Sequence, residues 1–125
     1  MAAYYELPGL EQIYLEDSFV LGVAILPGSV RVQLDVVLRE GHPSYVAPVD
    51  NEQYCFRKGA LTLEEVSEVT WYMPPGPPAI DASGDTDYGG VDSYEVEGSV
   101  HRITGEIGEL TVTCGRYSLH LGEGR

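Results

Sequence analysis

The strict alternation of apolar and polar residues between positions 30 and 39 constrains the fold more than any other feature of this sequence. The apolar residues occupy every second position: Val30, Val32, Leu34, Val36 and Leu38. Polar residues stand between them: Arg31, Gln33, Asp35 and Arg39. A period of two places one set on each face of an extended chain. The segment therefore predicts a β-strand with one face in the core and one face in solvent.

The preceding run, Ser18 to Leu26, is apolar on both faces, which is typical of a strand that is covered on both sides. Pro27 and Gly28 separate it from the alternating segment. Two strand patterns joined by a short Pro-Gly turn predict a β-hairpin.

Shorter strand patterns follow at 54–58, 60–63 and 68–73, with a turn expected at Gly59 between the first two. Between Glu64 and Ser67 the sequence allows two structures. Thr62 and Glu65 have the spacing of a capping box that opens a short helix, but the β-branched residues favour a bulged strand. Further strand patterns occupy 93–97, 100–103, 110–114 and 117–121.

These patterns predict an all-β protein with at most one short helical turn. The 125 residues form a single domain. Six to eight antiparallel strands would form a meander that folds into a small sandwich or a partly open barrel. The sequence does not distinguish these two architectures.

The longest irregular stretch runs from residue 74 to residue 92. It contains four prolines in five positions at its start and is acidic and glycine-rich in the remainder. Prolines remove backbone donors and hold the chain extended. A loop of this length in a compact domain usually either has a function or is disordered.

The charge limits the partners. Twenty acidic residues against 7 Lys and Arg give a formal net charge of −13, which argues against binding to nucleic acid, since phosphate affinity needs clustered basic residues. No apolar run reaches the length of a membrane-spanning helix. The first residues lack the basic and apolar regions of a secretory signal. We therefore expect a cytoplasmic protein that binds neither nucleic acid nor membranes.

No motif for catalysis or cofactor binding is present. The phosphate-binding glycine motifs and the GxSxG nucleophile motif are absent. His42, His101 and His120 lack metal-ligand spacing. Cys55 and Cys114 are expected to be buried thiols in a reducing compartment, with a disulfide between them as the alternative. The sequence thus predicts a protein that is not an enzyme and has no cofactor or metal.

Aspartates and tyrosines in and beside the loop form a candidate interaction surface. The spacing Asp85, Asp87, Gly90 is part of a calcium-loop pattern, but Gly89 and Val96 stand where that pattern needs oxygen ligands. A negative surface attracts basic proteins, and tyrosine is enriched at interfaces. The candidate residues are Asp81, Asp85, Asp87, Tyr88, Asp92, Tyr72 and Tyr45.

Several segments resemble small bacterial all-β proteins. They are 14–23, 52–57 and 61–66 before Trp71. The end of the chain, 105–114 followed by 117–121, is similar to the closing hairpin of immunity-protein-type β domains. Such domains neutralise a cognate toxin in the cytosol. The resemblance implies a single-domain bacterial cytoplasmic protein without established chemistry, and it carries over no site residue.

Two functions compete at this point. The first is a non-enzymatic acidic domain that binds a basic protein, with an immunity-type role implied by the resemblance. The alternative is a β-barrel that binds a small molecule, or an enzyme without a recognisable motif, and this needs a concave pocket.

Overall fold

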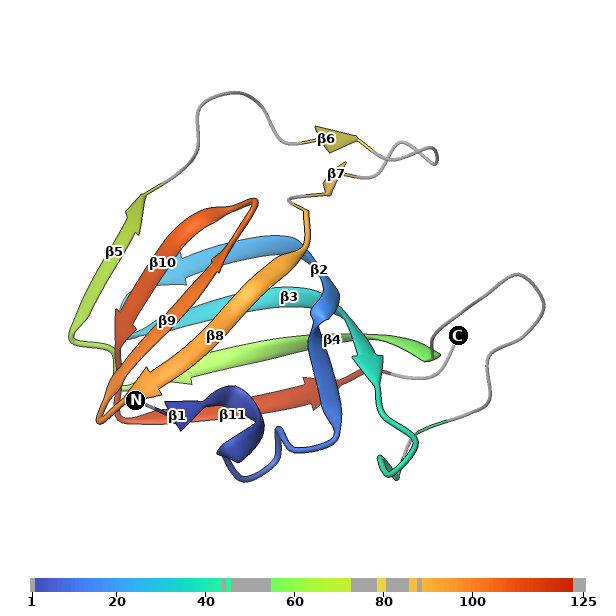
Figure 1. Ribbon diagram of the computed structural model, residues 1–125. Coiled ribbons are helices and arrows are strands. Elements are labelled where there is room, and N and C mark those ends of the chain that lie inside the picture. The colour runs from blue at the N-terminus through green and yellow to red at the C-terminus, as the bar shows by residue number, and fades with distance from the viewer. Residues whose placement is uncertain are drawn as a thin grey trace.

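The chain folds into two antiparallel β-sheets packed face to face, as a computed structural model shows for residues 2–43, 45, 55–72, 79–80, 86–87 and 89–122. Their strands cross at a steep angle (Figure 1). Sheet A has the order β1 (Ala2–Ala3), β8 (Val91–Glu97), β9 (Val100–Gly105), β10 (Gly108–Thr113) and β5 (Glu68–Tyr72). Sheet B has the order β11 (Arg116–Leu121), β4 (Cys55–Glu64), β3 (Ser29–Leu38) and β2 (Ile13–Leu26).

Neither sheet closes into a barrel, so the architecture is the sandwich of the two that the sequence allowed. Eight strands among the described residues have five residues or more, within the predicted range. The helical content of the described residues is one 3-10 turn, η1 (Tyr4–Glu6). The two-residue strands β6 (Ala79–Ile80) and β7 (Thr86–Asp87) pair with each other, and most of the predicted 74–92 loop lies outside the described residues.

The predicted hairpin is confirmed as β2 and β3, which pair from Leu26 opposite Ser29 down to Ile13 opposite Leu38. Every second residue of β3 is buried from Val30 onward, as the alternation requires. The expectation that the apolar run is covered on both sides is wrong at both of its ends, because Phe19 is 38 % exposed and Ile25 and Leu26 are each 50 % exposed. The strand lies at the edge of sheet B, so its last residues have a paired strand on one side only.

The predicted turn at Gly59 is wrong, because β4 runs through it without interruption. Gly59 is required for another reason. A Cβ at this position would lie 2.8 Å from the His120 carbonyl oxygen and 3.0 Å from Leu121 Cδ2. The missing side chain therefore lets β11 lie close against β4, a contact that depends on the tertiary structure.

The segment 64–67 is neither a helix nor a bulged strand. Glu64 is the last residue of β4, and residues 65–67 form a short connection that carries the chain from sheet B to sheet A, with Glu65 at φ 56°. Hydrogen bonds hold both of its sides: Val66 N–H donates to the Gly28 carbonyl and Ser67 N–H donates to the Thr113 carbonyl. The chain returns to sheet B at Gly115, whose N–H donates to the Glu64 carbonyl.

The core fills the space between the inner faces of the two sheets. Its fully buried members include Leu63 and Val32 of sheet B and Leu110 and Val112 of sheet A. Strand β2 also reaches sheet A, since Val20 N–H donates to the Gly89 carbonyl and Phe19 forms a bridge with Gly90. Most described side chains on the outer faces of both sheets are at least partly exposed, although Val37 on the outer face of β3 is buried, and these faces are where a binding surface can form.

Candidate functional site

Two of the predicted interaction residues lie at one end of sheet A. Tyr72 is the last residue of β5 and is 70 % exposed, and Asp92 is exposed near the start of β8. Strands β9 and β10 lie between β8 and β5. At the usual spacing of about 4.8 Å between neighbouring strands, Asp92 and Tyr72 therefore lie about 14 Å apart. Tyr45 is elsewhere and is partly buried against the core.

The other predicted positions are not placed by the structure. Asp81, Asp85 and Tyr88 lie outside the described residues. Of Asp87 the structure describes the backbone, which lies in β7. The interaction surface predicted from the loop is therefore represented by Tyr72 and Asp92.

Strand register adds to these two residues a polar surface that sequence reasoning missed. Residues directly opposite each other in antiparallel strands share a face. On the outer face of sheet A this gives three rows across β8, β9, β10 and β5: Glu97, Val100, Thr113 and Glu68; Glu95, Arg102, Thr111 and Thr70; Ser93, Thr104, Glu109 and Tyr72. We call these twelve residues the acidic face.

The acidic face carries four glutamates against one arginine. Arg102 lies at its centre, opposite Glu95 in the register, and its Nε is 3.1 Å from Glu109 Oε1. Because both partners of that ion pair are 44 % exposed, the pair itself contributes little to stability. Glu68 and Glu97 have no ion pair with another described residue and present their charge to solvent.

The outer face of sheet B has a different charge balance. On β3, β4 and β11 its charged side chains are three cations and two acids: Arg31, Lys58, Arg116, Asp35 and Glu64. These three strands of sheet B thus have a slight excess of positive charge on their outer face, whereas the outer face of sheet A is negative.

A shallow groove of about 400 Å³ lies on the outer face of sheet B. Its lining includes the side chains of Arg31, Lys58 and His120, with Gly59 and Ala60 between them. His120 points away from Leu119 and Leu121, as its place in the alternation predicts.

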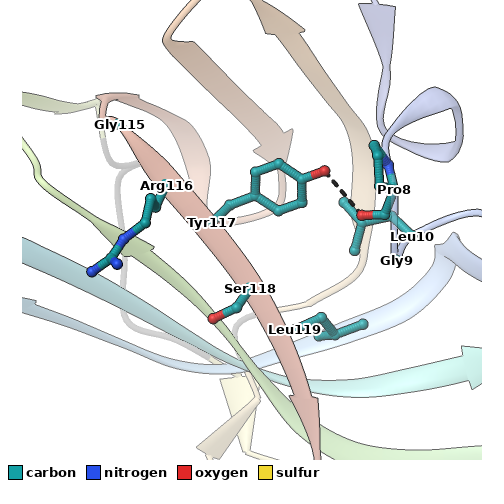
Figure 2. Close-up of a pocket in the computed structure, with 8 residues that line it drawn as sticks. All are labelled: Pro8, Gly9, Leu10, Gly115, Arg116, Tyr117, Ser118 and Leu119. Carbon is teal, nitrogen blue, oxygen red and sulfur yellow. Dashed lines mark hydrogen bonds between the residues drawn. The ribbon is translucent and has the colours of Figure 1, made fainter.

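A second groove, of about 520 Å³, separates β11 from the segment 8–10 (Figure 2). The ring of Tyr117 points across it, and the Tyr117 hydroxyl donates to the Pro8 carbonyl over 2.9 Å. The remaining lining consists of Gly9, Leu10, Gly115, Arg116, Ser118 and Leu119. The described residues of this lining include no carboxylate, imidazole or thiol.

The described residues also contain a buried polar pair that the sequence analysis treated as unrelated positions. Tyr94 Oη lies 2.6 Å from His101 Nδ1, and both side chains point between the sheets. Burial raises the pKa of Tyr94 above its usual value and lowers the pKa of His101. Both groups are therefore uncharged near neutral pH and closed off from solvent. The turn at Gly98 was the sequence signal from which a common face for Tyr94 and His101 could have been predicted.

An extended set of aromatic contacts joins this pair to the start of the chain. The rings of Tyr4 and Tyr94 stack at 6.3 Å, and the rings of His101 and Tyr117 lie 5.7 Å apart. The Tyr4 hydroxyl donates to Glu16 and accepts from the Leu15 N–H. Desolvation and the nearby Glu16 raise the pKa of Tyr4 to about 12. These contacts tie the N-terminal segment to both sheets, which is a structural role.

The cysteines do not form a bridge. Cys114 is a buried free thiol, as predicted, and burial raises its pKa. It follows β10 and lies next to the Glu64 end of β4, whereas Cys55 begins that strand. Nine residues of strand span about 30 Å, far beyond the Cα separation of about 7 Å that a disulfide tolerates.

Within the ranges that the structure describes, no three His, Cys, Asp or Glu side chains are arranged to hold a metal ion. The same ranges contain no helix with the length and apolar character needed to cross a bilayer. The chain matches no protein-family model, and it shows no significant similarity to a curated protein or to a solved structure.

Proposed function

We propose that this protein is a non-enzymatic binding domain, and that the acidic face of sheet A binds a basic surface of another protein. The observation that carries the proposal is the segregation of charge across the sandwich. Four glutamates project from one flat sheet face, with Tyr72 exposed at its corner. A local negative field of this kind raises the rate of encounter with a basic partner.

The chemistry of the face favours a protein partner. Its rows combine carboxylates with threonine and serine hydroxyls, which hydrogen-bond to a partner's polar groups without leaving charges unpaired. Tyr72 supplies an apolar ring with a polar tip, the residue type enriched at protein interfaces. A basic toxin in the bacterial cytoplasm is the partner class that we propose, because the resemblance to immunity-type domains is compatible with this surface.

The test removes charge from the acidic face and compares the result with equal neutralisation elsewhere. Glu68 and Glu97 lie in one row at opposite edges of the face, and both are exposed. Glu11 and Glu40 are exposed outside sheet A and serve as the matched control. We expect the E68Q/E97Q variant to lose proteins that the wild type and the E11Q/E40Q variant both retain in a low-salt pull-down from a bacterial lysate.

Retention should also weaken as salt is added, because screening acts over about 8 Å at physiological ionic strength. The proposal is wrong if both double variants lose the same proteins to the same extent. That result would mean that the net charge, and not this face, determines the binding.

A further inference from the structure

The outer face of sheet B contains a ring of hydrogen-bond donors around one small residue, Ala60. In the register, Ala60 is opposite Gln33 on β3 and opposite His120 on β11. Lys58 and Thr62 lie two residues before and after it on the same face of β4. Arg31 is opposite Thr62 and completes the ring on the β3 side.

The middle of this ring is low because Ala60 has a small side chain and glycines lie beside it, and the lining also includes Leu21, Leu34 and Leu121. Gly122 N–H donates to the Lys58 carbonyl over 2.7 Å, so the position beside Lys58 on the third strand is a glycine. On the β2 side Gly22 faces Gln33, and a Cβ there would lie 3.4 Å from Gln33 Oε1. The result is the groove of about 400 Å³ in which Arg31, Lys58 and His120 surround Ala60.

These donors are available to a ligand. Arg31, Gln33, Lys58 and His120 are all exposed. Within the part of the chain that the structure describes, neither Arg31 nor Lys58 forms a salt bridge, whereas Arg102 and Arg116 do. The described residues that line the groove include no carboxylate.

We propose that this donor ring binds a small anion that carries phosphoryl groups, of which inorganic diphosphate is the simplest. Arg31 and Lys58 approach Ala60 from opposite directions along the strands, so each can meet one charged end of a short dianionic ligand. Gln33 and His120 approach from the two sides. Donors in four directions suit tetrahedral phosphoryl groups, while a planar carboxylate accepts within one plane.

The net charge of −13 does not exclude this site. The acidic face lies on the far side of the sandwich, beyond two sheets that are about 10 Å apart. Because the interaction between two charges weakens with their separation, the cations that line the groove act on a bound anion more strongly than the distant glutamates do. Among the described residues of β3, β4 and β11, the acids on the groove's own face are Asp35, opposite Lys58, and Glu64, whose Oε2 lies 2.7 Å from Arg116 Nη2. A long polyanion such as nucleic acid would extend past the groove toward those acids, and this favours a small ligand.

The experiment titrates the full chain with inorganic diphosphate at low ionic strength, followed by calorimetry and by the backbone amide signals of the labelled protein. We expect saturable binding with shifts confined to residues 31–33, 58–62 and 118–122. K58Q and R31Q should each weaken binding about tenfold, as expected for a lost charge-assisted hydrogen bond. R116Q is the matched control on the same face and should change the affinity less than about twofold, because Arg116 is already paired with Glu64.

A further variant distinguishes binding of diphosphate in the groove from general electrostatic attraction to the cations around it. Ala60→Leu keeps every charge and fills the floor of the groove at a position that faces solvent. We expect it to abolish the binding of diphosphate while thermal unfolding stays close to that of the wild type. The proposal is overturned if millimolar diphosphate causes no saturable change, if A60L binds as well as the wild type, or if R116Q is as damaging as K58Q. Equal affinity for malonate would overturn the assignment to phosphoryl groups.

Discussion

Tyr94 and His101 form a hydrogen bond of 2.6 Å between Oη and Nδ1 inside the sandwich, where the two residues are 1 % and 4 % exposed. An imidazole with its proton on Nε2 accepts this bond at Nδ1, and we assign that tautomer because the phenol then has a partner for its proton. The pair satisfies two buried polar groups at once, and among the described residues no buried side-chain nitrogen or oxygen lacks a partner.

Replacing Tyr94 with phenylalanine should therefore destabilise the protein. The change leaves His101 Nδ1 buried without a donor, and an unsatisfied buried polar group costs about 1–3 kcal/mol. Urea denaturation followed by tryptophan fluorescence measures the loss. Tyr72→Phe is the control, because Tyr72 is 70 % exposed and its hydroxyl stays hydrated. Equal stability of the Tyr94→Phe variant and the wild type would show that the hydrogen bond contributes nothing.

The same pair predicts a pH dependence of stability. Burial lowers the pKa of His101 below its ordinary value of 6.5 in the folded state. As pH falls below about 6.5, the unfolded chain takes up a proton that the folded chain does not, so the free energy of unfolding decreases. Above that pH the contribution is constant. The effect should appear as the pH falls from about 7 to about 5.5, before most carboxylates titrate.

His42 contributes in the same direction, because desolvation and the nearby Arg57 lower its pKa. The two histidines are separated by His101→Asn, whose amide oxygen replaces Nδ1 as an acceptor without titrating, and by His42→Gln. We expect each variant to flatten part of the pH profile in urea denaturation. A wild-type stability that rises on acidification through this range would contradict the assignment of neutral buried imidazoles.

Gly59→Ala should destabilise the protein, although alanine is usually tolerated in exposed strands. The new Cβ would lie 2.8 Å from the backbone carbonyl oxygen of His120, which cannot move without breaking the pairing of β11 with β4. Forcing atoms into a well-packed contact costs about 1–3 kcal/mol. Gly22→Ala is the matched control, since its Cβ meets the flexible Gln33 side chain at 3.4 Å. In thermal denaturation, the Gly59→Ala variant should unfold at a clearly lower temperature than the Gly22→Ala variant.

Cys114 should resist thiol reagents while the protein is folded. Its side chain is 4 % exposed, and burial raises its pKa, so both access and thiolate formation are suppressed. In a Cys55→Ala background, labelling in buffer should be much slower than labelling in urea. Rapid reaction in buffer at the same pH would show that the corner between β10 and β11 opens readily.

The strand patterns were predictable because alternation is a local property. The sides assigned to Val30–Leu38, to Tyr94 and Val96 and to Leu119–Leu121 depend on which residues are neighbours along the chain, and all agree with the observed burial. The errors arose where a distant strand decides the outcome. Gly59 was interpreted as a turn because glycine is a turn residue, but it is needed for the approach of β11, which follows it by almost sixty positions.

The candidate surfaces were less predictable for the same reason. The sequence contains the glutamates at 68, 95, 97 and 109, but their common face depends on how β5, β8, β9 and β10 pair. The donors around Ala60 come from three strands that are distant along the chain.

The sequence by itself determined an all-β chain with a strong negative charge and indicated which side chains share a face in the alternating segments, because extended backbone alternates its side chains with a period of two. Only the tertiary structure decided that the strands form two open sheets, that the acids gather on one outer face, and that Arg31, Lys58 and His120 surround Ala60 on the other. Charge and hydrogen bonding act through space over a few ångströms, and positions far apart in sequence come within that range only through strand pairing.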